Sequence, residues 1–381
     1  MKLAKSNAQT SAPSDLDFMR VALRLARRGF GRTSPNPMVG AVLVRDGAVI
    51  GKGWHRRAGG FHAEIEALSG SGYNARGATL FVTLEPCCTH GRTPPCTDAI
   101  IAAGIRRVVA AARDPNPAHS GKGFEILRRA GIAADAGLLC QEAEELNEGF
   151  NHWIVRKTPF VIVKAAMSLD GKIAAASGQS KWITGEKARA WGMRLRAGAD
   201  AILVGVNTIA RDNPSLTARL PGFADKALRR IILDPRARSP LEANVFSDAV
   251  APLTTLVVTR AAPKRRVEAF SARVRVLEAP ARNGVIDLRW LLRTLGRENI
   301  TSLLVEGGGE TNAGFLAAGL AQRIAFFYAP MVLGGRAAPK AVGGVGVPRA
   351  ANGIALREAA WRRLGTDLLL TARVNTRARH Y

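Results

Sequence analysis

The chain has few of the residues that build secreted or membrane-embedded proteins. Only four cysteines occur among 381 residues, and three of them lie between positions 87 and 96. Thiols grouped in this way do not make a disulfide framework, and they point to a metal ion or catalysis in a reducing compartment. No run of about 20 uncharged apolar residues is present, so we expect no membrane span. The first residues, MKLAKSNAQTSAPSD, lack the apolar segment of a secretory signal, which favours a cytoplasmic protein.

Acidic residues are also scarce. The chain has 30 Asp and Glu against 55 Lys and Arg, a net charge of +25. Residues 1–150 hold 19 basic and 14 acidic side chains, whereas residues 151–381 hold 36 and 16. An anionic partner would explain this excess, and so would arginine enrichment on solvated surfaces, since no dense block of Lys and Arg occurs.

The order of apolar and turn-forming segments predicts an α/β domain over residues 15–155. Residues 1–14 are small and polar and are predicted to be disordered. After them we expect a helix over residues 15–29 and a hairpin whose turn is Asp46-Gly47. Helices and strands then alternate up to a helix over residues 140–159. This order is typical of a three-layer α/β domain with a sheet that is largely parallel beyond the hairpin.

A second alternation predicts another α/β domain over residues 156–381. It begins after Lys157-Thr158-Pro159, and no internal repeat relates it to the first. The glycine-rich stretch 334–353 is expected to be a mobile loop. Strands are expected at FVIVKAAMS, DAILVGV, RRIILD, TTLVVT, SLLVEGG, RIAFFYAP and DLLLTARV, and helices at EKARAWGMRLRAG, at IDLRWLLRTLG and after GGETNAG.

His62, Glu64, Cys87 and Cys96 carry the clearest chemistry. His62 begins a predicted helix, Cys87 follows a strand, and Cys96 begins the next helix. One imidazole and two thiolates leave the fourth position of a tetrahedral zinc ion open to water, whose pKa the metal lowers to ~7. Glu64 could carry a proton from that water to a leaving amine. The pattern therefore predicts hydrolytic deamination of an amino-pyrimidine or purine.

A purely structural zinc site is the alternative interpretation. Cys88, His90 or His55 could supply a fourth protein ligand and so close the site to water. Adjacent thiols such as Cys87 and Cys88 rarely bind one tetrahedral ion, because their side chains leave the backbone in different directions. Asn36 flanks the same region, either as an amide that orients a pyrimidine or as a structural amide.

The His-x-Glu…Pro-Cys pattern resembles the zinc deaminases of the cytidine deaminase superfamily, although eight residues separate Cys87 from Cys96. This long insert is similar to that in the bifunctional deaminase/reductases of riboflavin biosynthesis. So are the segments TSPNPMVG, GFHAE, TLEPC, HGRTPPC and RDPNP, and the resemblance covers residues 15–150. It implies a catalytic Glu64 and one zinc ion per chain, held by His62, Cys87 and Cys96.

A glycine-rich turn at residues 305–311 is the main signal in the second half. No Gly-x-Gly-x-x-Gly follows an opening strand, so this half is not a standard Rossmann unit. Glycines between a strand and a helix let backbone N–H groups approach a phosphate, although a plain tight turn explains them equally well.

Further segments of this half resemble the reductase half of the same family. They are KAAMSLDGKIA, SKWITG, RAGADAILVGVNTI, DNPSLTAR and VEGGG. The resemblance implies a dihydrofolate-reductase-like α/β domain that uses NADPH, after a cytidine-deaminase-like one. The family has Ser at the position of Pro235, so the preference between NADPH and NADH is open. The implied nucleotide contacts are Ala166, Trp182, Thr208, Asp212, Gly308, Gly309, Glu310, Thr311, Asn312, Ala313 and Gly314. The implied substrate contacts are Ser180, Arg196, Leu216, Arg219 and Glu306, with Arg196 and Arg219 suited to a phosphate.

The implied function is a two-step conversion of a phosphorylated pyrimidine. The first half would deaminate 2,5-diamino-6-ribosylamino-4(3H)-pyrimidinone 5′-phosphate. The second would reduce the ribosyl chain with NADPH, giving 5-amino-6-ribitylamino-uracil 5′-phosphate. We expect a homo-oligomer that binds neither nucleic acid nor membrane.

Two alternatives remain open. One is a zinc nucleic-acid deaminase with a basic RNA-binding C-terminal domain, against which stands the lack of an aromatic-interleaved basic stripe. The other is a non-enzymatic scaffold stabilised by zinc.

Overall fold

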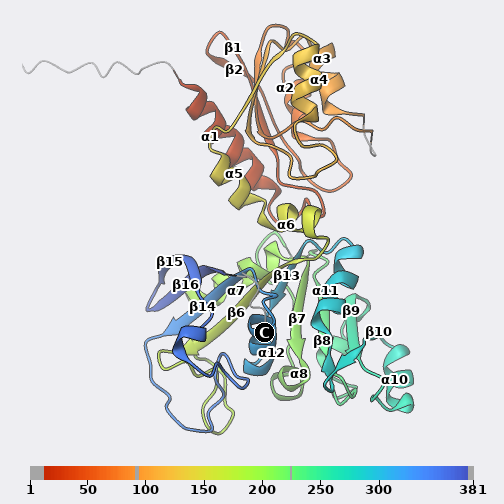
Figure 1. Ribbon diagram of the computed structural model, residues 1–381, viewed down its shortest axis with the longest axis vertical. Coiled ribbons are helices and arrows are strands. Elements are labelled where there is room, and N and C mark those ends of the chain that lie inside the picture. Colours follow the sequence, from red (N-terminus) through yellow and green to blue (C-terminus); the bar gives the residue numbers. More distant parts are fainter. Residues whose placement is uncertain (1–12, 91–93, 224, 376–381) are drawn as a thin grey trace, which may run out of the picture. The chain divides into compact units, whose positions relative to one another are not determined.

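The computed structural model describes residues 13–90, 94–223 and 225–375 (Figure 1). The chain forms two compact units, Met1–Val155 and Arg156–Tyr381. Residues 1–12, most of the segment expected to be disordered, lie outside the described residues. Ser14 caps the first helix: the Asp17 N–H donates to Ser14 Oγ, and the Asp17 carboxylate accepts the Ser14 N–H.

The first unit is a five-stranded sheet in the order β2-β1-β3-β4-β5, with helices on both faces. The predicted hairpin is confirmed, because β1 and β2 are antiparallel and Asp46 and Gly47 between them have φ of 50° and 74°. Strands β3, β4 and β5 are parallel, as predicted. Its elements are α1 (Asp15–Ala26), β1 (Gly40–Arg45), β2 (Ala48–Trp54), α2 (Ala63–Gly70), β3 (Thr79–Leu84), α3 (Cys96–Ala102), β4 (Arg107–Ala112), α4 (Lys122–Arg129), β5 (Ala133–Ala136), α5 (Cys140–Leu146) and α6 (Glu148–Arg156).

Two apolar cores make this unit three-layered. One lies between the sheet and α2, α3 and α4, and it includes Ala67, Ile100 and Phe124. The other lies beneath α1 and α5, and it includes Met19 and Ala143. Figure 1 shows α1 and α5 together on one face of the sheet and α2, α3 and α4 on the other. The loops at the ends of the strands are therefore framed by helices, and they carry the site described below.

The helix predicted over residues 140–159 is wrong as a single element. It consists of α5 and α6, which are separated at Asn147. The buried Asn147 side chain accepts the Met38 N–H at 2.7 Å and donates to the Met38 carbonyl at 2.9 Å. This pair of hydrogen bonds joins the end of α5 to a segment 109 residues earlier, which helical periodicity could not reveal.

The second unit is built on a nine-stranded sheet in the order β10-β9-β8-β7-β13-β6-β14-β16-β15. Strands β10 to β14 in this order are parallel, and β16 joins antiparallel to both β14 and β15. Its strands are β6 (Phe160–Ser168), β7 (Ala201–Gly205), β8 (Arg229–Leu233), β9 (Thr254–Val258), β10 (Arg275–Glu278), β11 (Ala281–Arg282), β12 (Val285–Ile286), β13 (Ser302–Val305), β14 (Arg323–Ala329), β15 (Leu356–Leu364) and β16 (Asp367–Val374). Its α-helices are α7 (Glu186–Gly198), α8 (Val206–Asp212), α9 (Asn244–Ser247), α10 (Lys264–Ser271), α11 (Leu288–Arg297) and α12 (Gly309–Ala317).

All the strands expected in this unit are present, and α12 contains the GETNAG segment after which a helix was expected. The glycine-rich stretch 334–353, which was expected to be a mobile loop, is hydrogen-bonded to other parts of the unit over its first half. The Ala341 N–H donates to the Gly171 carbonyl at 3.0 Å, and the Gly343 N–H donates to the Gly309 carbonyl at 3.0 Å. None of the helices in the described parts of either unit is long and apolar enough to cross a membrane.

Candidate active sites

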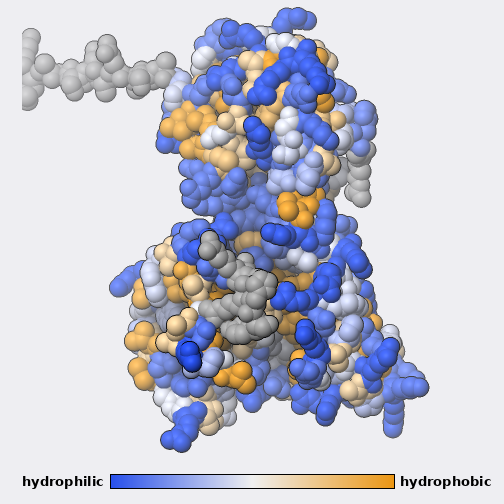
Figure 2. Space-filling view, in the orientation of Figure 1, coloured by the Kyte–Doolittle hydropathy of each residue, from blue (hydrophilic) through white to orange (hydrophobic). Residues whose placement is uncertain are grey.

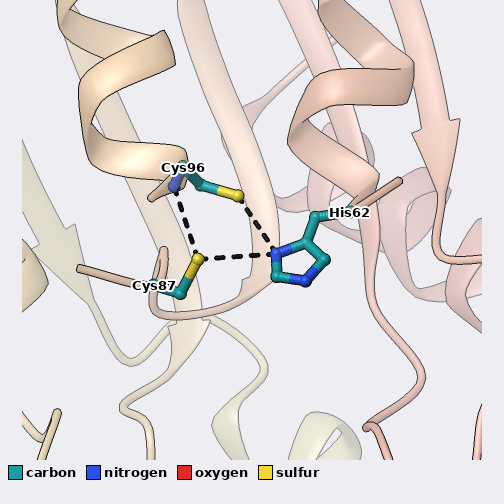
Figure 3. Close-up of side chains that lie close together, drawn as sticks. All are labelled: His62, Cys87 and Cys96. Carbon is teal, nitrogen blue, oxygen red and sulfur yellow. Dashed lines mark hydrogen bonds between the residues drawn. The ribbon is translucent and has the colours of Figure 1, made fainter. Parts of the chain in front are cut away.

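His62, Cys87 and Cys96 converge in the first unit (Figure 3). His62 is the N-cap of α2, Cys87 follows β3, and Cys96 is the first residue of α3. The Nδ1 atom of His62 lies 3.2 Å from the Cys96 Sγ and 3.4 Å from the Cys87 Sγ. The Cys96 backbone N–H donates to the Cys87 Sγ at 3.3 Å. Three ends of secondary structure thus bring one imidazole nitrogen and two sulfurs to a single point.

This donor set fits a zinc ion. Bonds of about 2.3 Å to sulfur and 2.1 Å to nitrogen, in a tetrahedral arrangement, separate those two ligands by about 3.6 Å, close to the distances observed. The hydrogen bond to Cys96 has the largest effect on the pKa of the Cys87 thiol and lowers it. Burial acts in the opposite direction, but the hydrogen bond to His62 lowers the pKa further, so that it lies well below its usual range. A thiolate is the form that binds zinc.

Among the described residues, the ligand group contains only these three side chains. Cys88, His90 and His55, which the sequence left open as a fourth ligand, lie outside it. Three protein ligands leave one coordination position for water or substrate, which is the arrangement of a catalytic zinc site and not of a structural one.

Glu64 lies in the first turn of α2 and is only 4% exposed. It lines the same cavity as His62 and Cys87. Burial, followed by the charge of Cys87, raises the pKa of Glu64 to about 7. Glu64 therefore lies in the same cavity as the converging His62 and Cys87 side chains.

A cavity of ≈ 320 Å³ opens beside this group, with room for a pyrimidine ring. Two parts of its wall, Glu85 and the side chains of α6, were not predicted. Glu85 accepts the N–H groups of Asp114, Gly121 and Gly123 at 2.9–3.1 Å, and so joins the end of β3 to the loop after β4 and to the first turn of α4. The polar lining consists of Asn36, His55, His62, Glu64, Glu85, Cys87, Asp114, Asn116 and His119, and Phe150, Trp153 and Ile154 of α6 add an apolar side.

His119 holds the long insert between the two cysteines. Its Nδ1 lies 3.3 Å from the Asp114 carboxylate, and its Nε2 lies 3.0 Å from the hydroxyl of Thr89. The RDPNP segment was a signal for Asp114 and Asn116, but no sequence feature indicated that His119 would reach Thr89 across 30 residues.

The second unit contains a cavity of ≈ 720 Å³ where β7, β8 and β13 end. Gly308 is the N-cap of α12, and a side chain on Gly309 would lie 2.3 Å from the Lys340 carbonyl oxygen. The hydroxyl of Ser180 donates to the Asp212 carboxylate at 3.1 Å. Of the predicted contacts, those that line this cavity are Ser180, Thr208, Asp212, Gly308, Gly309, Glu310, Thr311 and Gly314.

The other predicted contacts lie outside this lining. Asn312 is buried, and its amide donates to the Ala341 carbonyl at 2.8 Å, so it supports the glycine-rich loop. Trp182 is 71% exposed, with the guanidinium of Arg189 4.7 Å from its ring centre. The remaining residues outside the lining are Ala166, Arg196, Leu216, Arg219, Glu306 and Ala313.

Arg196 and Glu306 form a buried ion pair. The Nε and Nη2 atoms of Arg196 donate to the two Glu306 oxygens at 2.9 Å each, and Lys164 Nζ lies 3.5 Å from the same carboxylate. Burial alone would raise the pKa of Glu306, but the charges of Arg196 and Lys164 outweigh it and lower the pKa to about 2. The guanidinium of Arg196, which from the sequence was considered suited to a phosphate, thus faces a carboxylate. Arg219 is exposed and has no side-chain partner in the described ranges.

Two family models match the chain. The model described as the RibD C-terminal domain matches residues 159–370. The model for the cytidine and deoxycytidylate deaminase zinc-binding region matches residues 12–112. The first match covers the residues that line the cavity of the second unit, and the second match includes the converging His62, Cys87 and Cys96.

Relatives of known name match nearly the whole chain. The riboflavin biosynthesis protein RibD of Actinobacillus pleuropneumoniae is 42% identical over 358 residues, which cover 94% of each chain. The protein of the same name from Aquifex aeolicus is 47% identical, over 84% of this chain and 88% of the relative.

Solved structures agree in fold along both units. Acinetobacter baumannii RibD is 36% identical with a TM-score of 0.85, and the match covers 95% of this chain and 99% of that one. The diaminohydroxyphosphoribosylaminopyrimidine deaminase/5-amino-6-(5-phosphoribosylamino)uracil reductase of Thermotoga maritima is 37% identical with a TM-score of 0.78, over 94% and 98%.

Proposed function

The chain belongs to the RibD family of bifunctional riboflavin-biosynthesis deaminase/reductases, and from this we propose which residues perform each of its two reactions. It is a zinc-dependent deaminase and an NADPH-dependent reductase that acts on a phosphorylated pyrimidine. We assign the deaminase to residues 15–155 and the reductase to residues 156–381.

His62, Cys87 and Cys96 hold the zinc ion of the deaminase. Zinc, when bound there, supplies a Lewis acid that activates water at neutral pH. Glu64 would carry two protons of the attacking water in turn, the first to the ring nitrogen and the second to the departing amine. The cavity walls exclude bulk water and hold the ring with its amino-bearing carbon toward the ligand group. The observation that supports this assignment best is the presence of the three ligands and Glu64 in one cavity.

The cavity of the second unit binds NADPH and the deaminated intermediate. Gly308 and Gly309 let the backbone at the start of α12 approach the nucleotide phosphates, and Thr208 and Asp212 face the same space. NADPH, when bound there, would supply a hydride to C1′ of the ring-opened imine form of the sugar, and the imine nitrogen would take up a proton. We assign the other nucleotide contacts to Ala166, Trp182, Glu310, Thr311, Asn312, Ala313 and Gly314.

Substrate contacts in this unit come from four positions besides Arg219. They are Ser180, Arg196, Leu216 and Glu306, of which Arg196 and Glu306 form the ion pair described above. Arg219 has no side-chain partner among the residues that the structure describes, and we assign to it the substrate phosphate.

Mass spectrometry of the diamino-pyrimidine phosphate, with and without NADPH, tests both assignments. Zinc-loaded enzyme alone should exchange one amino group for oxygen with release of ammonia. Addition of NADPH should add two hydrogens to that product. Chelation of zinc should abolish the first change and leave the second intact when the deaminated intermediate is supplied. Two added hydrogens without prior deamination would contradict the order of the two steps.

We also infer a cytoplasmic homo-oligomer that binds no nucleic acid. Support for self-association comes from β15, the last strand of the sheet, whose side chains are exposed along nearly its whole length, Trp361 at 59%. Strand edges of this kind are sites of pairing. Sedimentation of the purified chain as a monomer, or salt-sensitive binding of a generic RNA at physiological ionic strength, would contradict this inference.

A further inference from the structure

Arg211 lines the cavity of the second unit from the last turn of α8, and its side chain is exposed. In the described ranges, no carboxylate or carbonyl oxygen accepts a hydrogen bond from its guanidinium. Among the described residues of the lining, Lys340 is the only other basic side chain. A guanidinium that faces a cavity in this state is free to bind an anion, because it gives up no partner within the protein.

The two cations lie at different ends of the cavity. A side chain on Gly309 would lie 2.3 Å from the Lys340 carbonyl oxygen, so Lys340 adjoins the start of α12, where the nucleotide phosphates are proposed to bind. Helix α8 begins there too, because a side chain on Gly205, its N-cap, would lie 2.8 Å from the hydroxyl of Thr311. At about 1.5 Å of rise per residue, Arg211 lies about 9 Å along α8 from Gly205.

The end of α8 that carries Arg211 points toward β8. Asn213, the C-cap of α8, accepts two hydrogen bonds from Asn244 at 2.8 Å, one on its side-chain oxygen and one on its carbonyl oxygen. Asn244 begins α9, the helix that follows β8. Arg211 is therefore displaced from α12 in the direction of β8, across the sheet.

The cavity wall beside β8 is apolar. It consists of Leu233, Pro235, Val285, Ile286 and Leu288, of which Leu233, Ile286 and Leu288 belong to one apolar cluster. Val285 is 61% exposed, although it is apolar and lines a cavity. A flat heteroaromatic base would cover such a wall, and cofactor sites are commonly built from apolar walls with a few polar groups between them.

We propose that Arg211 binds the 2′-phosphate of NADPH and so gives the reductase unit its preference for NADPH over NADH. With the diphosphate at the start of α12, the adenosine extends along α8 and places its adenine on the apolar wall beside β8. The ribose between them then carries its 2′-phosphate at the end of α8, beside Arg211. NADH has a hydroxyl at that position and leaves the guanidinium without an anion. This inference rests on the proposed binding of NADPH in this cavity.

The total charge of the lining does not explain such a preference. Arg211 and Lys340 are balanced by Asp212 and Glu310, so the lining has no excess of positive side chains. At the end beside β8, Pro235 has no N–H to offer a phosphate. Selection of the 2′-phosphate therefore depends on the position of one guanidinium, whose fork can donate to two phosphate oxygens at once.

Two nucleotides that contain only the adenosine end of the cofactors test this contact. The first, 2′,5′-ADP, carries the 2′-phosphate, and the second, 5′-AMP, lacks it. Calorimetric titration of the full chain gives the Kd of each. Arg211→Gln should raise the Kd of 2′,5′-ADP about 10- to 100-fold and leave that of 5′-AMP within about twofold, because only the first nucleotide loses a charge-assisted contact. Equal Kd values of 2′,5′-ADP for the wild type and Arg211→Gln would overturn the proposal.

Two further variants make the result specific. Arg211→Lys keeps the charge without the fork, so its Kd for 2′,5′-ADP should lie between those of the wild type and Arg211→Gln. Arg236→Gln is the matched control, because Arg236 is also exposed and directly follows Pro235 but does not line the cavity. It should bind both nucleotides as the wild type does. A loss of 2′,5′-ADP binding confined to Arg236→Gln would contradict the assignment to Arg211.

Reduction of the deaminated intermediate gives a second readout. In Arg211→Gln the ratio of kcat/KM for NADPH to that for NADH should fall by the same factor as the affinity for 2′,5′-ADP. The kcat with NADPH should stay unchanged, because the lost contact is equally strong in the ground state and the transition state. A lower kcat at an unchanged KM would show that Arg211 acts on the chemical step and would refute the proposal.

The binding data also separate two failures. A wild type that binds neither 2′,5′-ADP nor NADPH disproves the assignment of this cavity to the cofactor, and the role of Arg211 fails with it. A wild type that binds both, with the same affinities as Arg211→Gln, disproves only the role of Arg211.

Discussion

Replacement of Glu64 and replacement of a proposed zinc ligand should affect zinc content and the rate of ammonia release differently. Glu64→Gln keeps the ligand set and nearly the same shape, but an amide cannot carry the proton. We expect one zinc per chain and a decrease of ~10²–10⁴ in the rate of ammonia release. Cys87→Ser should instead lose the metal, because the thiolate at this position is a ligand. Zinc content and ammonia release, measured on both variants, check this, and near-normal turnover by Glu64→Gln would refute the assignment.

Cys88 tests whether the ligand set is complete. It adjoins Cys87 but does not belong to the group of converging ligand atoms. Burial raises the pKa of its thiol, whereas that of Cys87 is lowered. Cys88→Ser should therefore keep one zinc per chain and most of the deaminase activity. A loss of metal as large as that of Cys87→Ser would show a four-ligand, structural site.

The buried carboxylate of Glu306 makes the stability of the reductase unit depend on pH. Its pKa is about 2 in the folded chain, below the ordinary value of 4.5. A lowered native pKa stabilises the fold above the unfolded value, and this contribution is lost as the pH falls from about 5 toward 2. The difference in free energy of unfolding between wild type and Glu306→Gln should shrink over this range. Urea unfolding of both proteins at several pH values measures it, and a constant difference would contradict the ion pair.

Individual elements differ in how visible they are in the sequence. The parallel strands of the second unit were predictable because strands buried on both faces are continuous apolar runs. Strand β15 was not, because its side chains are exposed on both faces and no alternation remains. The convergence of His62, Cys87 and Cys96 was predictable, because the pattern of their residue types resembles that of the zinc deaminases. The bonds from His55 to Asn36 and from Arg196 to Glu306 join residues 19 and 110 positions apart, and only the fold brings them together.

Helix α2, which follows His62, packs directly on the backbone of β2. A side chain on Gly53 would lie 2.3 Å from the Ala63 carbonyl oxygen and 2.4 Å from the Ala67 nitrogen. Gly53→Ala should displace α2, weaken zinc binding and destabilise the unit by about 1–3 kcal/mol. Gly70→Ala is the matched control. Gly70 is the last residue of α2, and a side chain there would come no closer than 3.3 Å to its nearest neighbour, the Lys52 carbonyl oxygen. Chelator competition and thermal melts measure both effects, and equal zinc affinity in the two variants would contradict this packing argument.

Internal ion pairs neutralise only part of the positive charge of the whole molecule. Arginines of the second unit pair with acidic residues, for example Arg229 and Arg275 with Glu298, and Arg230 with Asp248. Figure 2 shows hydrophilic side chains over much of the visible surface of both units. With 36 basic and 16 acidic residues in positions 151–381, many cations remain for anionic ligands. NADPH and the substrate phosphate are both anions, so part of the excess has a function in binding them.

Because the chain divides into two units after residue 155, we predict that a variant that loses one reaction keeps the other. Glu64→Gln should reduce the deaminated intermediate with normal kinetics when it is supplied directly. Arg219→Ala should release ammonia normally but show a raised KM for the intermediate. A lost charge-assisted contact costs ~1.5–3 kcal/mol, which corresponds to about a 10- to 150-fold increase.

Arg219 serves this test better than Arg196, whose removal would leave the buried Glu306 with Lys164 as its remaining cation. Arg293→Ala is the matched control, because this arginine on α11 is also exposed and unpaired within the described ranges. Steady-state kinetics of both half-reactions on the three variants give the result. An unchanged KM in a folded Arg219→Ala protein would show that the substrate phosphate is bound elsewhere. A loss of ammonia release in the same protein would show that the two sites depend on each other.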